Sequence, residues 1–137
     1  MLGTVTKNRE QALSSLNRIR QAGYDGIELN RFMIHPSSLM VRALTKAAGM
    51  PTGNGGKLDW HELVGTSGLS VISLHADLGS LEKETDAVIE EAKSYHTDTV
   101  VITGMYRFDY SDETAVNNLA ERLNTVGRTL KQSDLQL

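Results

Sequence analysis

The sequence predicts an α/β fold with a parallel sheet. Helical and strand-like segments alternate along its 137 residues, and strands separated by roughly 30 residues with a helix between them form βαβ units. The strand segments Val71–Leu74 and Val100–Ile102 are mostly apolar, as is typical of strands buried on both faces. No linker, low-complexity tract or block of like charges divides the chain, so residues 1–137 are expected to form one continuous α/β layer.

The first half of the chain is predicted to run helix, strand, helix, helix. The first helix has apolar residues at helical spacing, and glycines or prolines mark where segments stop. In order, we expect a helix over Arg9–Ala22 capped by Asn8 and Gly23, a strand over Tyr24–Leu29, a helix from Ser37 or Ser38 to Gly49, and a short helix capped by Asp59 and closed by Gly68.

The second half is predicted to run strand, helix, strand, helix, strand. We expect a strand over Leu69–His75, a helix over Ser80–Tyr95 with Leu81, Ala87, Val88, Ala92 and Tyr95 facing inward, a strand over Thr99–Thr103 ended by Gly104, a long helix capped by Ser111, and the start of a strand at Asp134–Leu137. The apolar stripe of the long helix consists of Ala115, Leu119, Leu123, Val126 and Leu130.

Composition excludes several classes of function. The 14 basic and 17 acidic side chains give a net charge of −3, which does not favour a nucleic-acid partner. The absence of cysteine excludes disulfides, thiolate metal sites and cysteine nucleophiles. Apolar runs are too short for a membrane span, and the N-terminus lacks the apolar core of a signal peptide. We therefore expect no membrane partner and a cytoplasmic location.

The glycine-rich stretch 53–57 is interpreted as a connecting loop. A phosphate-binding loop of the Walker type needs a second glycine followed by Lys and then Ser or Thr, with another glycine five residues earlier. Here Leu58 follows Gly56 and Lys57, and Pro51 stands where the first glycine is required. Lys57 remains within reach of an anionic ligand.

Glu28 and His75 are the strongest candidate functional residues, because ligands in parallel α/β folds bind at the carboxyl ends of the strands. Glu28 lies near the end of its strand among apolar residues, where a buried carboxylate needs a partner or a function. His75 follows four mostly apolar residues, and it is suited to bind a substrate hydroxyl, transfer a proton or ligate a metal. For both residues a purely structural role remains an alternative.

Two segments together resemble a known family. The stretches Ala22–Leu29 and Gly68–Ala76 are similar to the second and third strand regions of the xylose-isomerase-like TIM barrels, which include sugar phosphate isomerases/epimerases. Thr99–Gly104 is similar to strand four, and Asp134–Leu137 to the opening of strand five. The resemblance covers nearly the whole chain and implies a partial (β/α)8 TIM barrel, the N-terminal half of such a domain.

The resemblance implies metal-assisted proton transfer on a sugar, sugar phosphate or cyclitol, with a divalent ion (Mn, Mg, Co or Zn) in the complete barrel. The metal ligands of the family come from strands five to eight, so no metal ligand is assigned in this chain. The catalytic residues remain unknown, and the chain alone is expected to be inactive. Glu28, His75, Met105 and Arg107 are the candidate substrate-binding residues, because they match positions around the family's pocket.

Two alternatives remain. One is a half-barrel that acts as a binding or assembly module, as a homodimer or together with a C-terminal half, because it leaves sheet edges and an inner face uncovered. The other is an apurinic endonuclease-like phosphodiesterase, in which the residue matching His75 is a metal ligand. The stretch 104–107 lacks the histidine that this branch carries after strand four, which weakens that reading. The sequence does not name the sugar.

Overall fold

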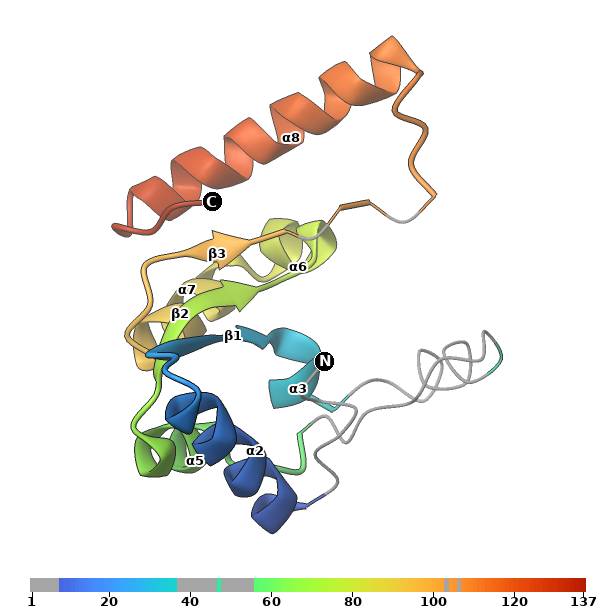
Figure 1. Cartoon of the computed structure of the whole chain (residues 1–137). Coiled ribbons are helices and arrows are strands. Elements are labelled where there is room, and N and C mark those ends of the chain that lie inside the picture. Colours follow the sequence, from blue (N-terminus) through green and yellow to red (C-terminus); the bar gives the residue numbers. More distant parts are fainter. Residues whose placement is uncertain (1–7, 37–46, 48–55, 103, 106) are drawn as a thin grey trace. The chain divides into compact units, whose positions relative to one another are not determined.

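The computed structural model describes residues 8–36, 47, 56–102, 104–105 and 107–137 (Figure 1). Within these residues the strands form one sheet with the order β1-β2-β3. Strands β2 (Ser70–His75) and β3 (Val100–Val101) pair in parallel, with Leu74 opposite Val100 and His75 opposite Val101. The α/β class with a parallel sheet is therefore confirmed.

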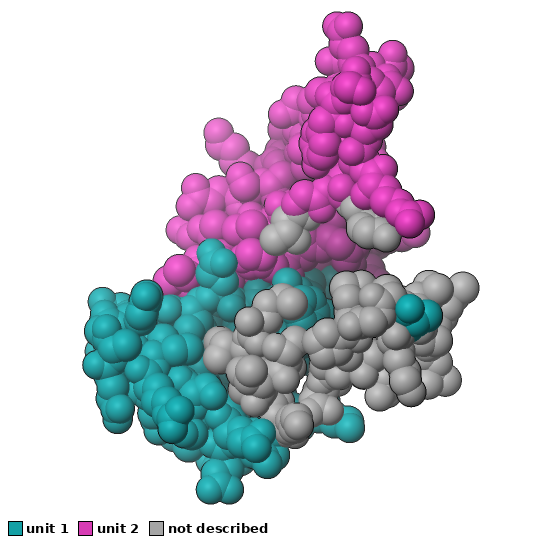
Figure 2. Space-filling view, turned by 45° about the vertical axis from the view of Figure 1, so that its right-hand side comes forward, with its two compact units in different colours: residues 1–71 teal, residues 72–137 magenta. Residues whose placement is uncertain are grey.

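The chain divides into two compact units, residues 1–71 and 72–137 (Figure 2). The boundary lies inside β2, after Val71. Each unit contains fully buried leucines, Leu16, Leu29 and Leu63 in the first and Leu74, Leu78, Leu81 and Leu130 in the second. Hydrophobic burial of this kind is the main stabilising term within each unit.

In the first unit, helix α2 (Arg9–Gln21) packs against helix α5 (Trp60–Ser67), as Figure 1 shows. The predicted caps Asn8, Asp59 and Gly68 are confirmed, whereas the C-cap of α2 is Ala22 and not Gly23, which follows it with φ +94°. The side chain of Asn8 accepts a hydrogen bond from the backbone N–H of Gln11 at 2.9 Å, and Asp59 accepts one from Glu62 at 3.0 Å. Gly68 ends α5 in the left-handed conformation with φ +68°, which glycine adopts without steric cost. Strand β1 (Gly26–Asn30) continues directly into the short helix α3 (Arg31–Ile34).

In the second unit, helices α6 (Leu78–Lys83) and α7 (Thr85–Ser94) both contact the long helix α8 (Glu113–Lys131). The Arg122 side chain of α8 donates two hydrogen bonds to the Glu82 carboxylate of α6, at 2.6 and 2.9 Å. These bonds hold the Glu82 pKa below its ordinary value, because the guanidinium stabilises the ionised carboxylate.

The helix predicted over Ser80–Tyr95 is wrong in its extent, because the structure has two helices that meet at Glu84. The backbone of Glu84 has φ −130° and ψ 33°, which is not helical. Within α7, Ala87, which was predicted to face inward, is exposed, and Ile89 is buried. Leu81, Val88, Ala92 and Tyr95 are buried as predicted.

The N-cap predicted for the last helix is also displaced by one residue. Asp112, and not Ser111, accepts the hydrogen bond from the backbone N–H of Ala115, at 3.1 Å. The Ser111 hydroxyl instead donates to the Asp109 carboxylate at 2.6 Å. A carboxylate is the stronger acceptor near the positive helix N-terminus, which explains why Asp112 takes this position.

The C-terminal residues begin a strand, as predicted. Gln136 forms a parallel bridge with Thr99. Its carbonyl accepts from Val100 N at 2.9 Å, and its N–H donates to Asp98 O at 2.8 Å. The predicted helix from Ser37 or Ser38 to Gly49 and most of the glycine-rich loop lie outside the described residues. No helix in the described part of the chain is long and apolar enough to cross a membrane.

Candidate functional site

Glu28 lies within β1, where the side chains alternate between buried and exposed. Ile27 and Leu29 are buried, whereas Glu28 between them is exposed. The expectation of a carboxylate in an apolar environment is therefore wrong. Successive side chains of a strand point to opposite faces of the sheet, so Glu28 lies on the face that β1 leaves open to ligands or solvent.

The end of β1 is held by hydrogen bonds around α3. The Asn30 side chain caps this short helix by accepting from Phe32 N at 3.3 Å. The Met33 carbonyl accepts from the indole N–H of Trp60 and from the backbone N–H of Gly56, both at 3.1 Å. Trp60 and Met33 are buried, whereas Phe32 is 41% exposed. This part of the carboxyl end is therefore well anchored and presents an aromatic ring to solvent.

His75 is the last residue of β2 and is half-buried. The strand pairing continues past it, because Ala76 N donates to Val101 O at 3.0 Å. Asp77 then caps α6 by accepting from the backbone N–H and the hydroxyl of Ser80, at 2.9 and 2.6 Å. The backbone on both sides of His75 is thus fixed, which favours a defined position for its imidazole.

The loop after β3 contains the other predicted residues, Met105 and Arg107. The Met105 N–H donates to the Tyr110 hydroxyl at 3.3 Å, and the rings of Phe108 and Tyr110 lie edge to face with centroids 4.7 Å apart. Arg107 is exposed and has φ +55°, in the left-handed region that side-chain-bearing residues rarely adopt.

Asp109 organises the same loop. Its carboxylate accepts from the hydroxyl and the backbone N–H of Ser111, at 2.6 and 2.9 Å. These hydrogen bonds to the charged form, the hydroxyl first, hold the Asp109 pKa below its ordinary value. Asp109 therefore remains ionised at neutral pH and acts as a loop anchor.

The four predicted residues fall in both units. His75, Met105 and Arg107 follow the paired strands β2 and β3 in the second unit, whereas Glu28 belongs to the first. Among the described residues, no group of three His, Asp or Glu side chains is placed to hold a metal ion. The described residues therefore do not form a site for the divalent ion that the family resemblance implies for the complete barrel.

The second unit contains an apolar groove of about 520 Å³ beside β3. Met105 is the predicted residue that lines it. Tyr110 of the same loop also lines it and was not predicted from the sequence, although Phe108 and Tyr110, two aromatic residues separated by Asp109, were a usable signal. The other lining residues are Thr99, Val100, Val101, Ile102, Gly104, Leu119, Leu123 and Leu137. We call these ten residues the β3–α8 groove.

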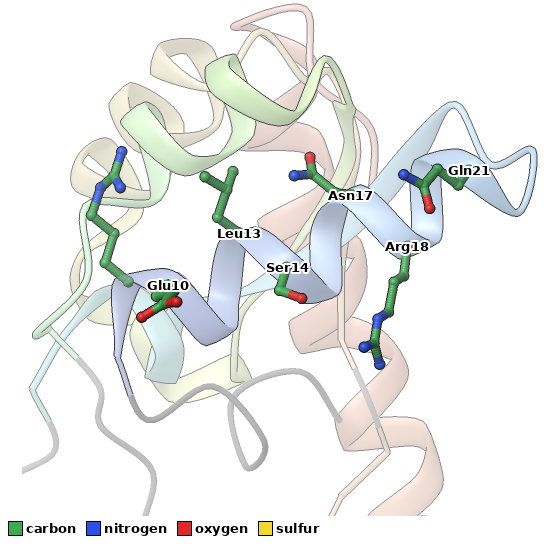
Figure 3. A pocket seen from close by; sticks show the side chains of 7 residues that line it. Glu10, Leu13, Ser14, Asn17, Arg18 and Gln21 are labelled. Atoms are coloured by element: carbon green, nitrogen blue, oxygen red, sulfur yellow. The ribbon is translucent and has the colours of Figure 1, made fainter.

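A second hollow, of about 410 Å³, lies along α2 (Figure 3). Its lining side chains, which include Leu13, Asn17 and Arg18, all project from successive turns of this one helix. It contains none of the predicted site residues, and its described lining comes from α2 alone. We therefore do not assign the candidate site to it.

Two solved structures are similar to this chain. A xylose isomerase-like TIM barrel protein from Mycobacterium smegmatis, in complex with magnesium, matches 98% of this chain and 47% of its own, with a TM-score of 0.56 and 16% identity. A sugar phosphate isomerase/epimerase from Parabacteroides distasonis matches 92% of this chain and 44% of its own, with a TM-score of 0.56 and 17% identity.

The chain thus spans about half the length of these two neighbours and has the fold of a partial TIM barrel. No family model and no curated protein sequence matches the chain. The fold expected from the strand segments is confirmed, and the roles of the four site residues stay predictions.

Proposed function

We propose that this chain is the N-terminal, ligand-binding half of a barrel that isomerises or epimerises a sugar, a sugar phosphate or a cyclitol. The single observation that carries the proposal is the position of His75 at the carboxyl end of β2, half-buried and fixed by the pairing of Ala76 with Val101. Ligands bind at this end of the strands in TIM barrels. The likeness to a sugar phosphate isomerase/epimerase supports the substrate class.

Side chains of this chain would bind and orient the ligand. A half-buried imidazole is suited to hydrogen-bond a sugar hydroxyl, or to move a proton at the carbon beside a carbonyl. Arg107, exposed in the loop after β3, offers a guanidinium that pairs with a carboxylate or phosphate group. The metal of the complete barrel would polarise substrate oxygens, but the described residues of this chain do not form its site.

A binding experiment with two histidine variants tests this function. The purified chain is titrated with D-xylose, D-fructose and D-fructose 6-phosphate, followed by NMR or calorimetry. We expect His75→Ala to weaken binding at least tenfold, because a buried hydrogen bond to the ligand is lost. His61→Ala is the matched control, since His61 is an exposed histidine on α5 and its replacement should change nothing. Equal binding by both variants would contradict the role of His75.

Turnover gives a second test. We expect no isomerisation by the purified 137-residue chain, with or without added Mg²⁺ or Mn²⁺, because no described cluster of side chains is placed to hold the ion. Metal-dependent interconversion of D-xylose by a sample of verified purity would overturn the assignment of the metal ligands to strands five to eight.

The β3–α8 groove favours a second candidate function, assembly with another polypeptide. The groove is mainly apolar, and Leu137, which lines it, is 43% exposed. Ile72, on β2 in the same unit, is 56% exposed. Apolar surface of this kind gains free energy when a partner covers it. Light scattering tests this candidate, since a module of this kind should form homodimers, and a clean monomer at high concentration would count against self-assembly.

A further inference from the structure

Phe32 is an aromatic residue of α3 whose side chain is exposed to solvent. Burying a phenylalanine side chain gains about 1.5–3 kcal/mol relative to leaving it exposed, yet Phe32 is 41% exposed while its neighbour Met33 is 7% exposed. The helix that carries it is not loose. Asn30 caps α3, and the Met33 carbonyl accepts two hydrogen bonds, one of them from buried Trp60.

Gly56 adds a further constraint at this place. It has φ +73°, and a Cβ atom there would lie 2.5 Å from Cδ and 2.7 Å from N of Pro36. A glycine is therefore needed where residue 56 donates its N–H to Met33 and passes against Pro36. The close approach of Gly56 fixes the C-terminal end of α3, and the Asn30 cap fixes its N-terminal end. The exposed ring of Phe32 therefore lies on a helix that is anchored at both ends.

The position of Phe32 distinguishes it from the other exposed aromatic residue beside β1. Tyr24, 63% exposed, precedes the strand at its amino end, and Phe32 follows at the carboxyl end. Ligands of parallel α/β folds bind outside the carboxyl ends of the strands. Binding sites are also enriched in aromatic side chains whose faces contact the ligand.

We propose that Phe32 is a stacking platform for the apolar face of a sugar ring. A pyranose or furanose presents several C–H groups on one face, and the electron-rich face of an aromatic ring attracts such positively polarised hydrogens while removing apolar surface from water. This inference rests on the proposed function, because it takes a sugar as the ligand. It adds a specificity-determining residue at the carboxyl end of β1.

The single tryptophan provides the readout. Trp60 gives one indole N–H signal, and this N–H donates to the carbonyl of the residue that follows Phe32, at 3.1 Å. A ligand that stacks on Phe32 should therefore shift the indole signal in a two-dimensional NMR spectrum. We use the same probes as above, D-xylose, D-fructose and D-fructose 6-phosphate.

We expect Phe32→Ala and Phe32→Leu to weaken sugar binding about tenfold and Phe32→Trp to restore it, because Leu keeps an apolar side chain but lacks the aromatic face. Tyr24→Ala is the matched control and should bind like the unmodified chain. An unchanged indole signal in the ligand-free variants verifies that α3 remains in place, and Phe32→Leu keeps the test valid where Phe32→Ala does not fold.

The outcomes separate this inference from the proposed function. Sugar binding that Phe32→Leu leaves unchanged while His75→Ala abolishes it would overturn the stacking role and leave the proposed function intact. Absence of binding by all three sugars to the unmodified chain would overturn the proposed ligand class, and the stacking role with it. Weaker sugar binding by both Phe32→Leu and Tyr24→Ala would also contradict the inference, because a ligand that stacks on Phe32 at the carboxyl end of β1 should not depend on Tyr24 at the amino end.

Discussion

Replacing Trp60 by phenylalanine should release α3 from its anchor. The indole of Trp60 is 3% exposed and donates a hydrogen bond to the Met33 carbonyl at 3.1 Å. Phenylalanine keeps an aromatic ring in the core but has no donor and a smaller volume. The Met33 carbonyl retains the bond from Gly56 N, also 3.1 Å, so it does not become an unsatisfied buried acceptor.

The expected cost follows from these contacts. A net intramolecular hydrogen bond contributes about 1 kcal/mol, and the incompletely filled volume adds about 1–2 kcal/mol. The free energy of unfolding of the first unit should therefore fall by about 2–3 kcal/mol. Loss of about 1 kcal/mol of local anchoring also makes opening of α3 roughly fivefold more frequent.

Urea unfolding and amide hydrogen exchange measure the two effects separately. The His35 amide, which donates to Arg31 O at 2.9 Å, reports on α3 and should exchange about fivefold faster in Trp60→Phe. Leu63→Ala is the control, because Leu63 is a fully buried residue of the same helix α5 and its truncation costs about 2–5 kcal/mol without touching the bond to Met33. Equal His35 exchange in the two variants at low urea would refute the anchoring role of the indole.

Three further predictions concern the second unit. Asp112→Ala should lower the free energy of unfolding by about 0.5–2 kcal/mol and cost more than Ser111→Ala, because Asp112 provides the N-cap of α8; equal thermal stability of the two variants would place the cap elsewhere. Ser73→Ala should leave stability unchanged or raise it by up to about 1 kcal/mol in urea unfolding, because the Ser73 hydroxyl is buried and has no hydrogen-bond partner in the described part of the chain; a clear loss would show that the hydroxyl is bonded. Glu82→Gln should have a lower melting temperature than the unmodified chain at pH 7. Arg122 lowers the Glu82 pKa from its ordinary 4.5, so the stabilisation is present above that value and is lost as the pH falls through the lowered pKa; a difference in melting temperature that persists at pH 2 would contradict this cause.

Local sequence signals predicted the segment ends that depend on a single residue type. Asn8, Asp59 and Gly68 were identifiable because cap residues act through their own side chain or their own backbone freedom. The break at Glu84 was not predictable in this way. Leu81, Val88 and Ala92 in the two helices and Tyr95 at the C-cap of α7 continue the same helical spacing across it, and all four are buried.

The candidate site was predictable in its location and less so in its detail. Ligands bind at strand ends in this fold, and this rule selected Glu28 and His75, whereas the family resemblance selected Met105 and Arg107 in the loop after β3. The exposure of Glu28 depends on which face of β1 packs inward, which a five-residue strand does not reveal. Helix α3 has four residues, too few for a periodic pattern, so the sequence did not predict a role for Phe32.

The bridge between Thr99 and Gln136 has a consequence for the order of folding. Its two residues are 37 positions apart, and the Gln136 side chain also donates to the Thr99 hydroxyl at 3.1 Å. Closing a flexible loop of that length costs about 3 kcal/mol of chain entropy, whereas α8 between them forms from local contacts. The C-terminal residues should therefore dock late, after α8 has shortened the path, and stopped-flow refolding should detect their ordering as the last step in the second unit.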